Sequence, residues 1–425
     1  MAEDWPQMWK ELGLELENHD KLMAALGPLY LEWFAGQPNR PEAMRYFDFV
    51  ISEVHGLRIK ELLDHKGKGG AVVGTFCLFV PEEVVVALDG VAVGLCAGTD
   101  FSVPIAEAEL PRNLCPLIKS FYGFKRGKIC PYFESADVVV GETTCDGKKK
   151  VYEHLGKIHP VYVMEVPNKK GPADRELWRA ELNNFVAAME EITGNKLSED
   201  NLAAAVKKVN AKRRALRRVH ELRWNDPAPI SGKDALLIMQ ISFYDDLERF
   251  TRKADEVADE LEKRVAAGEG VFPAGTPRLM VSGTPMAIPN WKVHHVVETS
   301  GAAVVAEEMC TGFRYYKNTV NEDAKTLDEM KEALVDHYMD INCACFTPNE
   351  PRLDDIEYLY KNSGAQGIIH ATLSFCTPYL LEQGSVKRFA AERDIPLVAV
   401  ETDYSEGDVG QLKTRVEALI EQVST

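Results

Sequence analysis

The 425-residue chain lacks the features that would direct it to a membrane or to a nucleic acid. Its longest apolar stretch, Ala71 to Val80, stops at Pro81 and is well short of the roughly 20 residues that a membrane span needs. Its formal net charge of −17 opposes binding to DNA, RNA or anionic lipid. The first residues are acidic and lack the basic start and apolar core of a signal peptide. The sequence therefore predicts a cytoplasmic protein whose partners are small molecules or other proteins.

The chain also has no phosphate-binding loop and no repeated tight cysteine pairs. No G-x-x-x-x-G-K-[ST] run occurs, so ATP is not expected to bind as it does in P-loop proteins. Structural zinc sites usually show two tight cysteine pairs, whereas here only Cys343 and Cys345 are so close in sequence. An odd number of cysteines, nine, in a reducing cytosol favours metal binding or catalysis over disulfides. Structural zinc and simple buried thiols remain as alternatives to an iron–sulfur site.

Short apolar runs alternate with helical patterns on both sides of a long helical stretch, which predicts two parallel-sheet domains. In the first series, helices are expected at 83–90 and 148–156, and strands at 71–80, 91–98, 136–145 and 159–167. In the second, helices are expected at 245–267 and 409–423, and strands at 278–283, 302–309, about 338–343, 366–375 and 395–400. The α/β fold thus predicted has a helical N-terminal segment (1–65), a first α/β domain (66–172), a helical linker (173–224) and a second α/β domain (225–425).

Six of the cysteines fall where the expected strands or turns end. In chain order they are Cys77, Cys115 and Cys145, then Cys310, Cys343 and Cys376. Open parallel sheets bind their ligands beyond the carboxyl ends of the strands. Soft thiolates placed at those ends of two sheets predict an iron–sulfur site.

The remaining cysteines and the start of one helix refine this prediction. Cys115 precedes Pro116, which is typical of a helix N-terminus, where the helix dipole stabilises a thiolate. Cys345 is a substitute for Cys343, because alternate residues of an extended segment share a face. Cys96 and Cys130 have no evident partner and are expected to be buried thiols.

Several charged residues near these cysteines have competing interpretations. His370 is a candidate proton donor, although a histidine within a buried strand is more often only hydrogen-bonded. Glu82 and Glu83 are expected to stabilise the first turn of a helix. The basic run 207–223 is expected to be a solvated helix face, with docking of a partner as the alternative. The lysines at 148–150 stand where they would offset the charge of a cluster.

Long and unusual motifs around the cysteines carry a family resemblance. They are LPRNLCPLIKS, SADVVVGETTCDGKKKVYEHLG, EEMCTGFRYY, NCACFTPNEPR and GIIHATLSFC. Over residues 70–400, the chain resembles the large subunits of the 2-hydroxyacyl-CoA dehydratase and benzoyl-CoA reductase family. It is most similar to the double-cubane-cluster branch of that family. The resemblance implies two flavodoxin-like domains that face each other across a cleft, with the metal cluster in the cleft.

The resemblance also implies a set of cluster ligands. In the dehydratases, one [4Fe–4S] cluster is held by three cysteines, which correspond here to Cys115, Cys145 and Cys376. In the double-cubane branch, two cubanes joined by a bridging sulfide form an [8Fe–9S] cluster with three cysteines per cubane. The further set in this chain is Cys77, Cys310 and Cys343. Which three cysteines hold which cubane is left open.

The function implied by the resemblance is a demanding reduction. Members of the family receive electrons from a separate homodimeric activator, which carries its own [4Fe–4S] cluster and hydrolyses ATP. The lack of a phosphate-binding loop fits ATP being handled by that partner. We expect a homodimeric, oxygen-sensitive reductase component that acts on small molecules such as acetylene, hydrazine or azide. The alternatives are an (R)-2-hydroxyacyl-CoA dehydratase subunit with a [4Fe–4S] cluster and a non-catalytic iron–sulfur electron carrier.

Overall fold

Two four-stranded parallel sheets form the framework of the chain in a computed structural model that describes residues 5–424. The first sheet has the strand order β2-β1-β3-β4. Its two inner strands, β1 and β3, are rich in valine and buried, as expected for a parallel sheet covered on both faces, whereas its outer strands are only partly buried. The strands are β1 (Ala71–Thr75), β2 (Gly90–Gly94), β3 (Val138–Glu142) and β4 (Val161–Met164).

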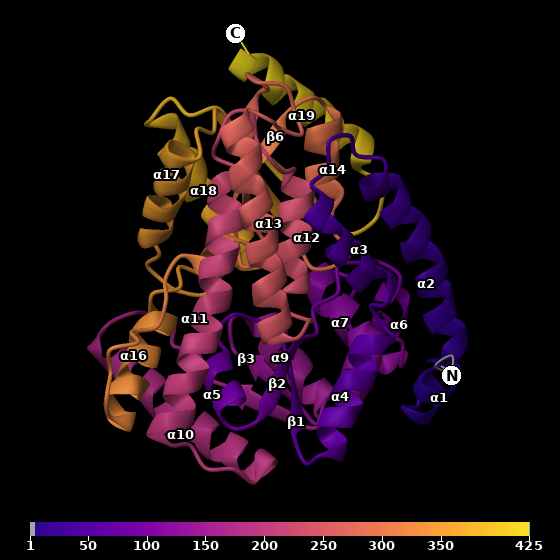
Figure 1. The fold of residues 1–425 in the computed structure, drawn as a ribbon, viewed down its shortest axis with the longest axis vertical. Helices are drawn as coiled ribbons and strands as arrows, with labels where there is room; N and C mark the ends of the chain where they lie inside the picture. Colours follow the sequence, from indigo (N-terminus) through magenta and orange to yellow (C-terminus); the bar gives the residue numbers. More distant parts are fainter. Residues whose placement is uncertain (1–4, 425) are drawn as a thin grey trace.

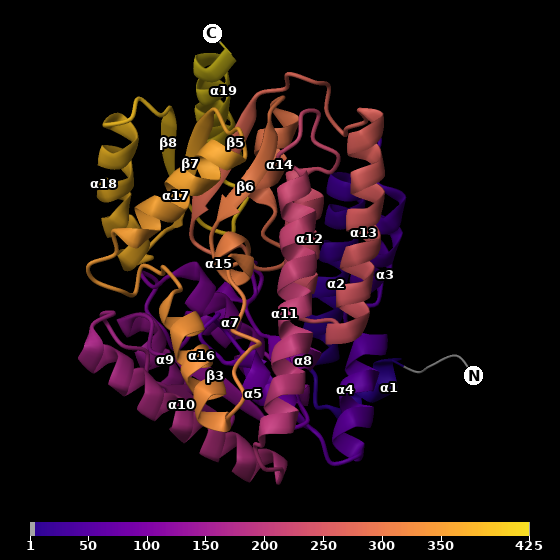
Figure 2. The same cartoon turned by 60° about the vertical axis from the view of Figure 1, so that its left-hand side comes forward.

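The second sheet repeats this topology, with the strand order β6-β5-β7-β8. Its strands are β5 (Arg278–Gly283), β6 (Ala303–Glu308), β7 (Gly367–Leu373) and β8 (Leu397–Thr402). Strands β5, β6 and β7 are buried along their whole length. The predicted α/β fold with two parallel-sheet domains is therefore confirmed. Figures 1 and 2 show the second sheet and its helices above the first.

One expected strand, at about 338–343, is absent from the described residues and the expectation is wrong. That part of the chain ends helix α16 (Leu327–Met339) and continues into a loop. Thr326 caps the helix by accepting a hydrogen bond from the amide of Glu329, whose side chain accepts one from the Thr326 amide in return. The capped helix α16 thus extends to Met339, into the short apolar run that was expected to form a strand.

Helices surround both sheets. Those of the first domain are α5 (Glu82–Ala87), α6 (Val103–Ala106), α7 (Pro116–Arg126), α8 (Pro131–Ser135) and α9 (Asp146–Leu155). Those of the second, besides α16, are α14 (Lys292–Thr299), α15 (Phe313–Tyr316), α17 (Pro351–Asn362), α18 (Thr377–Ala391) and α19 (Val409–Ser424). No helix within residues 5–424 combines the length and the apolar character that crossing a membrane requires.

The N-terminal helices contact both domains. They are α1 (Trp5–Glu11), α2 (Leu16–Tyr30), a π-helical turn (Leu31–Ala35), a 3-10 turn (Glu42–Met44), α3 (Arg45–Ser52) and α4 (Leu57–Gly67). The ring of Phe34 packs edge-on against Trp291 of the second domain, with 4.9 Å between centroids. Lys66 pairs with Asp137 of the first domain at 2.8 Å. This segment therefore bridges the two domains along one side of the molecule.

Four long helices join the two sheets: α10 (Pro172–Thr193), α11 (Glu199–Leu222), α12 (Gly232–Ile241) and α13 (Leu247–Ala267). Figure 2 shows α11 running from the lower lobe alongside the upper one. Lys212 and Arg213 of α11 are buried and pair with Glu82 and Glu83 of α5. The phenols of Tyr315 and Tyr338, from the second domain, donate to the same two glutamates.

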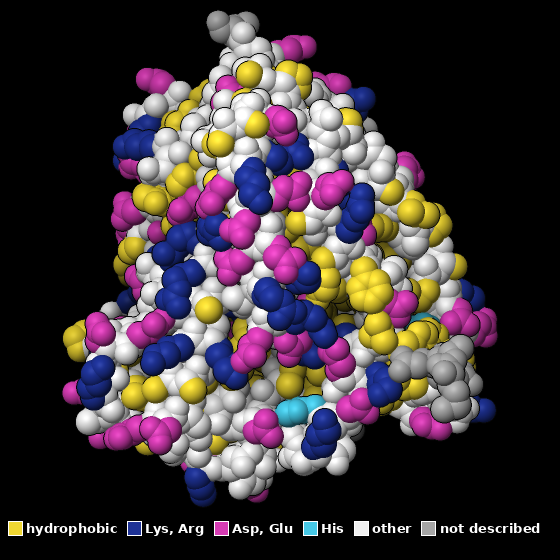
Figure 3. Space-filling model, viewed as in Figure 1, with side chains coloured by type: hydrophobic (Ala, Val, Ile, Leu, Met, Phe, Trp, Pro, Cys, Tyr) yellow, Lys and Arg dark blue, Asp and Glu magenta, His cyan; other side chains and the backbone are white. Residues whose placement is uncertain are grey.

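This network corrects two expectations. The basic run 207–223 is only partly a solvated face, because Lys207, Lys208 and Arg214 are exposed but most of its other charges are buried or paired within the chain. Besides Lys212 and Arg213, Arg223 is fully buried, and Arg218 pairs with three acids of α13, Asp255, Asp259 and Glu262. Figure 3 shows basic and acidic side chains interleaved over this face. Glu82 and Glu83 do lie in the first turn of α5, but their side chains bind α11 rather than their own helix end.

Candidate metal centre

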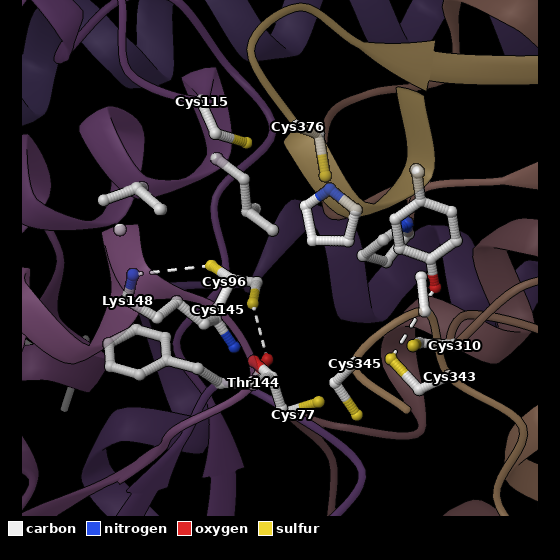
Figure 4. Close-up of a pocket in the computed structure, with 18 of the residues that line it drawn as sticks. Cys77, Cys96, Cys115, Thr144, Cys145, Lys148, Cys310, Cys343, Cys345 and Cys376 are labelled. Carbon is white, nitrogen blue, oxygen red and sulfur yellow. Dashed lines mark hydrogen bonds between the residues drawn. The ribbon is translucent and has the colours of Figure 1, made fainter. Parts of the chain in front are cut away.

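A cavity of about 500 Å³ lies between the two domains and is lined by eight of the nine cysteines. All six predicted ligands and the substitute Cys345 are among them (Figure 4). The eight are Cys77, Cys96, Cys115, Cys145, Cys310, Cys343, Cys345 and Cys376. Residues separated by up to 299 positions (376 − 77) are thus brought to one place.

The sheet topology explains this convergence. Cys77 follows β1 and Cys145 follows β3, and these neighbouring strands lie where the connections of the first sheet change direction. Cys310 follows β6 and Cys376 follows β7 at the carboxyl end of the second sheet. Such edges are the usual ligand sites of open parallel sheets. The two edges face each other across the cavity.

The sulfurs separate into two groups, and each group draws on both domains. The first, called here the Cys115 set, contains Cys115, Cys145 and Cys376. Interaction with Cys376 lowers the pKa of Cys115, and the charge of Cys115 contributes to the raised pKa of Cys145, for which burial is the main cause. The spatial grouping is therefore not the order along the chain.

The second group, called the Cys310 set, contains Cys77, Cys310, Cys343 and Cys345. Interaction with Cys310, and then with Cys345, lowers the pKa of Cys343 well below its ordinary value. Cys310 also interacts with Cys77 of the first domain. Cys343 and Cys345 lie in a loop after α16 rather than on a strand, yet both line the cavity.

Helix N-termini serve the Cys115 set. Cys115, Cys145 and Cys376 immediately precede α7, α9 and α18. The amide of Lys148 donates to Cys145 Sγ at 3.5 Å. The free amides and the dipole at a helix N-terminus stabilise a thiolate or an anionic cluster bound to it.

Side chains serve the Cys310 set. Arg314 of α15 donates to Cys310 Sγ at 3.8 Å, and the hydroxyl of Tyr379 lies 3.8 Å from Cys343 Sγ. Arg314 is held by an ion pair with Glu308, and Glu308 also binds Arg352 at 3.0 Å. The two arginines and Glu308 are essentially inaccessible to solvent, and Tyr379 is 6% exposed.

Of the three lysines at 148–150, only Lys148 has its side chain buried beside the cavity. Its ammonium lies 3.6 Å from Glu142, which accepts a hydrogen bond from the amide of Cys77 at 3.1 Å. Burial raises the pKa of Glu142. Lys149 is partly exposed and pairs with Asp146, and both residues also line the cavity, whereas Lys150 pairs with the exposed Glu153. Lys148 is therefore the one buried lysine of the three that is placed to offset the charge of a bound anion.

His370 does not line the cavity. It is fully buried on β7, where its Nδ1 lies 3.3 Å from the hydroxyl of Ser282. Burial lowers its pKa to about 3, so the imidazole is neutral at pH 7. The Ser282 hydroxyl in turn donates to Glu308, the partner of Arg314. His370 is thus connected to the Cys310 set through this chain of hydrogen bonds rather than by contact.

Cys96 and Cys130 differ from the other cysteines in their surroundings. Cys96 lines the cavity but donates to the carbonyl of Phe76 at 3.1 Å, and burial raises its pKa to about 12. Cys130 lies outside the cavity, and burial raises its pKa to about 11. The raised pKa of each favours the protonated thiol near neutral pH, as expected for cysteines without a thiolate partner.

The donor set fits a large iron–sulfur cluster better than a single ion. Within residues 5–424, no group of three or more His, Cys, Asp or Glu side chains converges closely enough to hold one metal ion. In a cubane, by contrast, each thiolate binds a different iron, so the sulfurs surround the cluster instead of meeting at a point. Seven sulfurs spaced around one cavity have that arrangement.

Sequence analysis missed Arg314 and Tyr379. Both lie within or beside quoted motifs, Arg314 four residues after Cys310 and Tyr379 three residues after Cys376. The spacing of Arg314 is that of neighbours on a helical turn, which is the one signal that could have indicated it.

Comparison with known proteins extends the geometric argument. Residues 77–423 match the family model described as 2-hydroxyglutaryl-CoA dehydratase, D-component. The chain is 39% identical over 376 residues to the protein of Escherichia coli (strain K12) named "Putative dehydratase subunit YjiM", covering 88% of this chain and 97% of that protein. It is 21% identical to the (R)-phenyllactyl-CoA dehydratase beta subunit of Clostridium sporogenes, covering 85% and 94%. It is 22% identical to a benzoyl-CoA reductase subunit of Thauera aromatica, covering 80% and 88%.

Proposed function

Because the chain belongs to the 2-hydroxyglutaryl-CoA dehydratase D-component family, we propose that it is an iron–sulfur reductase component of the double-cubane type. It binds an [8Fe–9S] cluster in the cavity between its domains and reduces small molecules there. Acetylene, hydrazine and azide are suitable probe substrates. The observation that carries the proposal is that two cysteine groups, each with at least three sulfurs, line a single cavity.

The ligands proposed for this cluster are the six predicted cysteines. The Cys115 set holds one cubane and Cys77, Cys310 and Cys343 hold the other, with Cys345 as the substitute for Cys343. Such a cluster supplies electrons at low potential, set by its charge, hydrogen bonding and solvent exclusion. The chain contributes helix N-termini and Lys148 on one side and Arg314 with Tyr379 on the other.

The proposed partners are an ATP-hydrolysing [4Fe–4S] activator and a second copy of this chain. Relatives are named as subunits of dehydratases and a reductase, which supports a protein partner in general terms. ATP hydrolysis is assigned to the activator because the chain has no G-x-x-x-x-G-K-[ST] run.

A second candidate function is that of an (R)-2-hydroxyacyl-CoA dehydratase subunit with one [4Fe–4S] cluster. The names of the relatives favour it, and the Cys115 set alone supplies three ligands. In this function the four sulfurs of the Cys310 set would not be cluster ligands. A non-catalytic electron carrier is the third candidate, and it would need no access of a substrate to the cavity.

Anaerobic turnover separates these functions. The purified chain is mixed with an ATP-hydrolysing iron–sulfur activator, and reduction of acetylene, hydrazine or azide is followed alongside dehydration of an (R)-2-hydroxyacyl-CoA. We expect small-molecule reduction only with both activator and ATP. Turnover of the acyl-CoA alone supports the dehydratase. Reduction and reoxidation of the cluster without turnover of either substrate class supports the carrier.

A further inference from the structure

A buried guanidinium and a phenol together contact two sulfurs of the Cys310 set. Arg314 is 2% exposed and donates from Nη1 to Cys310 Sγ and to the hydroxyl oxygen of Tyr379. Because that oxygen accepts from Arg314, its own proton is free to point at Cys343 Sγ, 3.8 Å away. The two side chains act as one unit, called here the Arg314–Tyr379 clamp.

The clamp is fixed from behind by ion pairs and hydrogen bonds. Glu308 accepts from Arg314 Nε at 2.6 Å, from Arg352 at 3.0 Å and from the hydroxyl of Ser282 at 2.7 Å. The guanidinium of Arg352 lies 5.0 Å from the centroid of the Tyr379 ring. A side chain held at so many points keeps its donors aimed at the sulfurs whether or not a cluster carries extra charge.

The other cysteine set has no equivalent. Across the residues that the structure describes, Arg314 is the only charged side chain that donates a hydrogen bond to one of the seven sulfurs. The Cys115 set is served by backbone amides, such as that of Lys148. Lys148 and Arg314 are each paired with a buried glutamate, Glu142 and Glu308, but only Arg314 also donates a hydrogen bond to a sulfur. The Cys310 set therefore receives a direct hydrogen bond from a charged side chain, whereas the charge of Lys148 acts on Cys115 and Cys145 only through space.

We propose that Arg314 and Tyr379 are positioning residues that make the Cys310 half of the cluster the one that takes up an added electron. This inference rests on the proposed function. When one electron passes to the cluster from an external donor, which is thereby oxidised, the added negative charge is stabilised where a fixed positive charge and hydrogen-bond donors lie closest. Hydrogen bonds to cluster sulfurs and nearby positive charge raise the reduction potential.

The test uses the anaerobic holoprotein and three variants. Arg314→Lys keeps the charge but loses the planar guanidinium that donates to Glu308 through Nε while Nη1 donates to Cys310 and Tyr379, and Tyr379→Phe removes only the hydroxyl. Arg223→Lys is the matched control, because Arg223 is equally buried and pairs with Glu307, the neighbour of Glu308 on β6, away from the cavity. The readouts are iron content and the midpoint of a reductive titration with Ti(III) citrate followed by EPR.

We expect Arg314→Lys and Tyr379→Phe to keep the wild-type iron content and to titrate at more negative potential, whereas Arg223→Lys titrates as the wild type does. In protein labelled with 15N-arginine, the reduced cluster should also show a nitrogen hyperfine coupling by ENDOR that Arg314→Lys abolishes.

Two outcomes overturn the inference. Wild-type potentials in both clamp variants at full iron content remove the tuning role and leave the proposed function intact. An equal shift in Arg223→Lys assigns the effect to general loosening of the fold. If Arg314→Lys loses iron, its potential cannot be compared with that of the wild type, and the midpoint potential of Tyr379→Phe alone then decides the test. A wild-type protein that binds no iron contradicts the proposed function itself, which is a separate result.

Discussion

The two cysteine sets differ in the groups that would stabilise negative charge on their sulfurs. The Cys115 set places each sulfur at the start of a helix, so that backbone amides face the anion. The Cys310 set has a loop and a four-residue helix instead, and it relies on the buried side chains of Arg314 and Tyr379. Backbone stabilisation tolerates many side-chain changes, whereas a buried guanidinium can be removed by one substitution. If both sets hold a cubane, as proposed above, this difference would allow the two halves to be tuned separately.

The largest effect is expected from removing ligands of either set. Changing Cys115 or Cys376 to Ala exposes an iron and removes an anchor, so iron content should fall sharply, and Cys310→Ala should do the same. Cys130→Ala, outside the cavity, is the control and should retain wild-type iron. Iron analysis of anaerobically purified variants measures this. Equal losses in all four variants would mean that the substitutions disturb folding rather than the cluster.

Each cysteine set contains residues of both domains, so its geometry depends on the contacts that hold the two domains together. Glu83 is fully buried and pairs with Arg213, so Glu83→Gln leaves a buried cation uncompensated and should lower the free energy of unfolding by roughly 3–5 kcal/mol. Glu176→Gln is the control, because its pair with Arg179 is exposed. Urea denaturation of the apoproteins reports the difference. If Glu83→Gln unfolds like the wild type, the pair does not lock the domains.

Within the Cys310 set, Cys343 and Cys345 should respond unequally. Cys343 is buried and lies against Tyr379, whereas Cys345 is only partly buried. We expect Cys343→Ala to lose more iron than Cys345→Ala, again measured as iron per chain. The reverse order would make Cys345 the ligand and Cys343 its neighbour.

The smallest effect is expected at Cys96, which lines the cavity without belonging to either set. Its thiol donates to the Phe76 carbonyl, and burial raises its pKa to about 12, so it is a poor source of thiolate. Cys96→Ser should therefore keep the iron content and the EPR spectrum of the wild type. A changed spectrum at full iron content would show that this sulfur also touches the cluster.

Local sequence patterns located the cysteines at strand ends, whereas the grouping of Cys115 and Cys145 with Cys376 came only from the family resemblance. The alternation of buried strands and helices predicted the sheet edges near Cys77, Cys145, Cys310 and Cys376, because strand ends are a local property. That Cys376 joins Cys115 depends on how two domains face each other, which no local pattern encodes. The partners of the α11 charges were hidden for the same reason, since Glu83 and Arg213 are 130 residues apart. The expected strand near 338–343 failed because an apolar run of that length is equally consistent with a helix end.

The central claim is that both cysteine sets hold metal at once, and the iron and sulfide content of the anaerobic wild-type protein tests it most directly. The account predicts about eight irons and about nine sulfides per chain, the composition of two cubanes that share a bridging sulfide. The spectrum of the oxidised protein should then change when a cysteine of either set is replaced. A reproducible content of about four irons and four sulfides, unchanged by Cys310→Ala and lost with Cys115→Ala, contradicts the claim and returns the chain to the single-cubane dehydratase subunit.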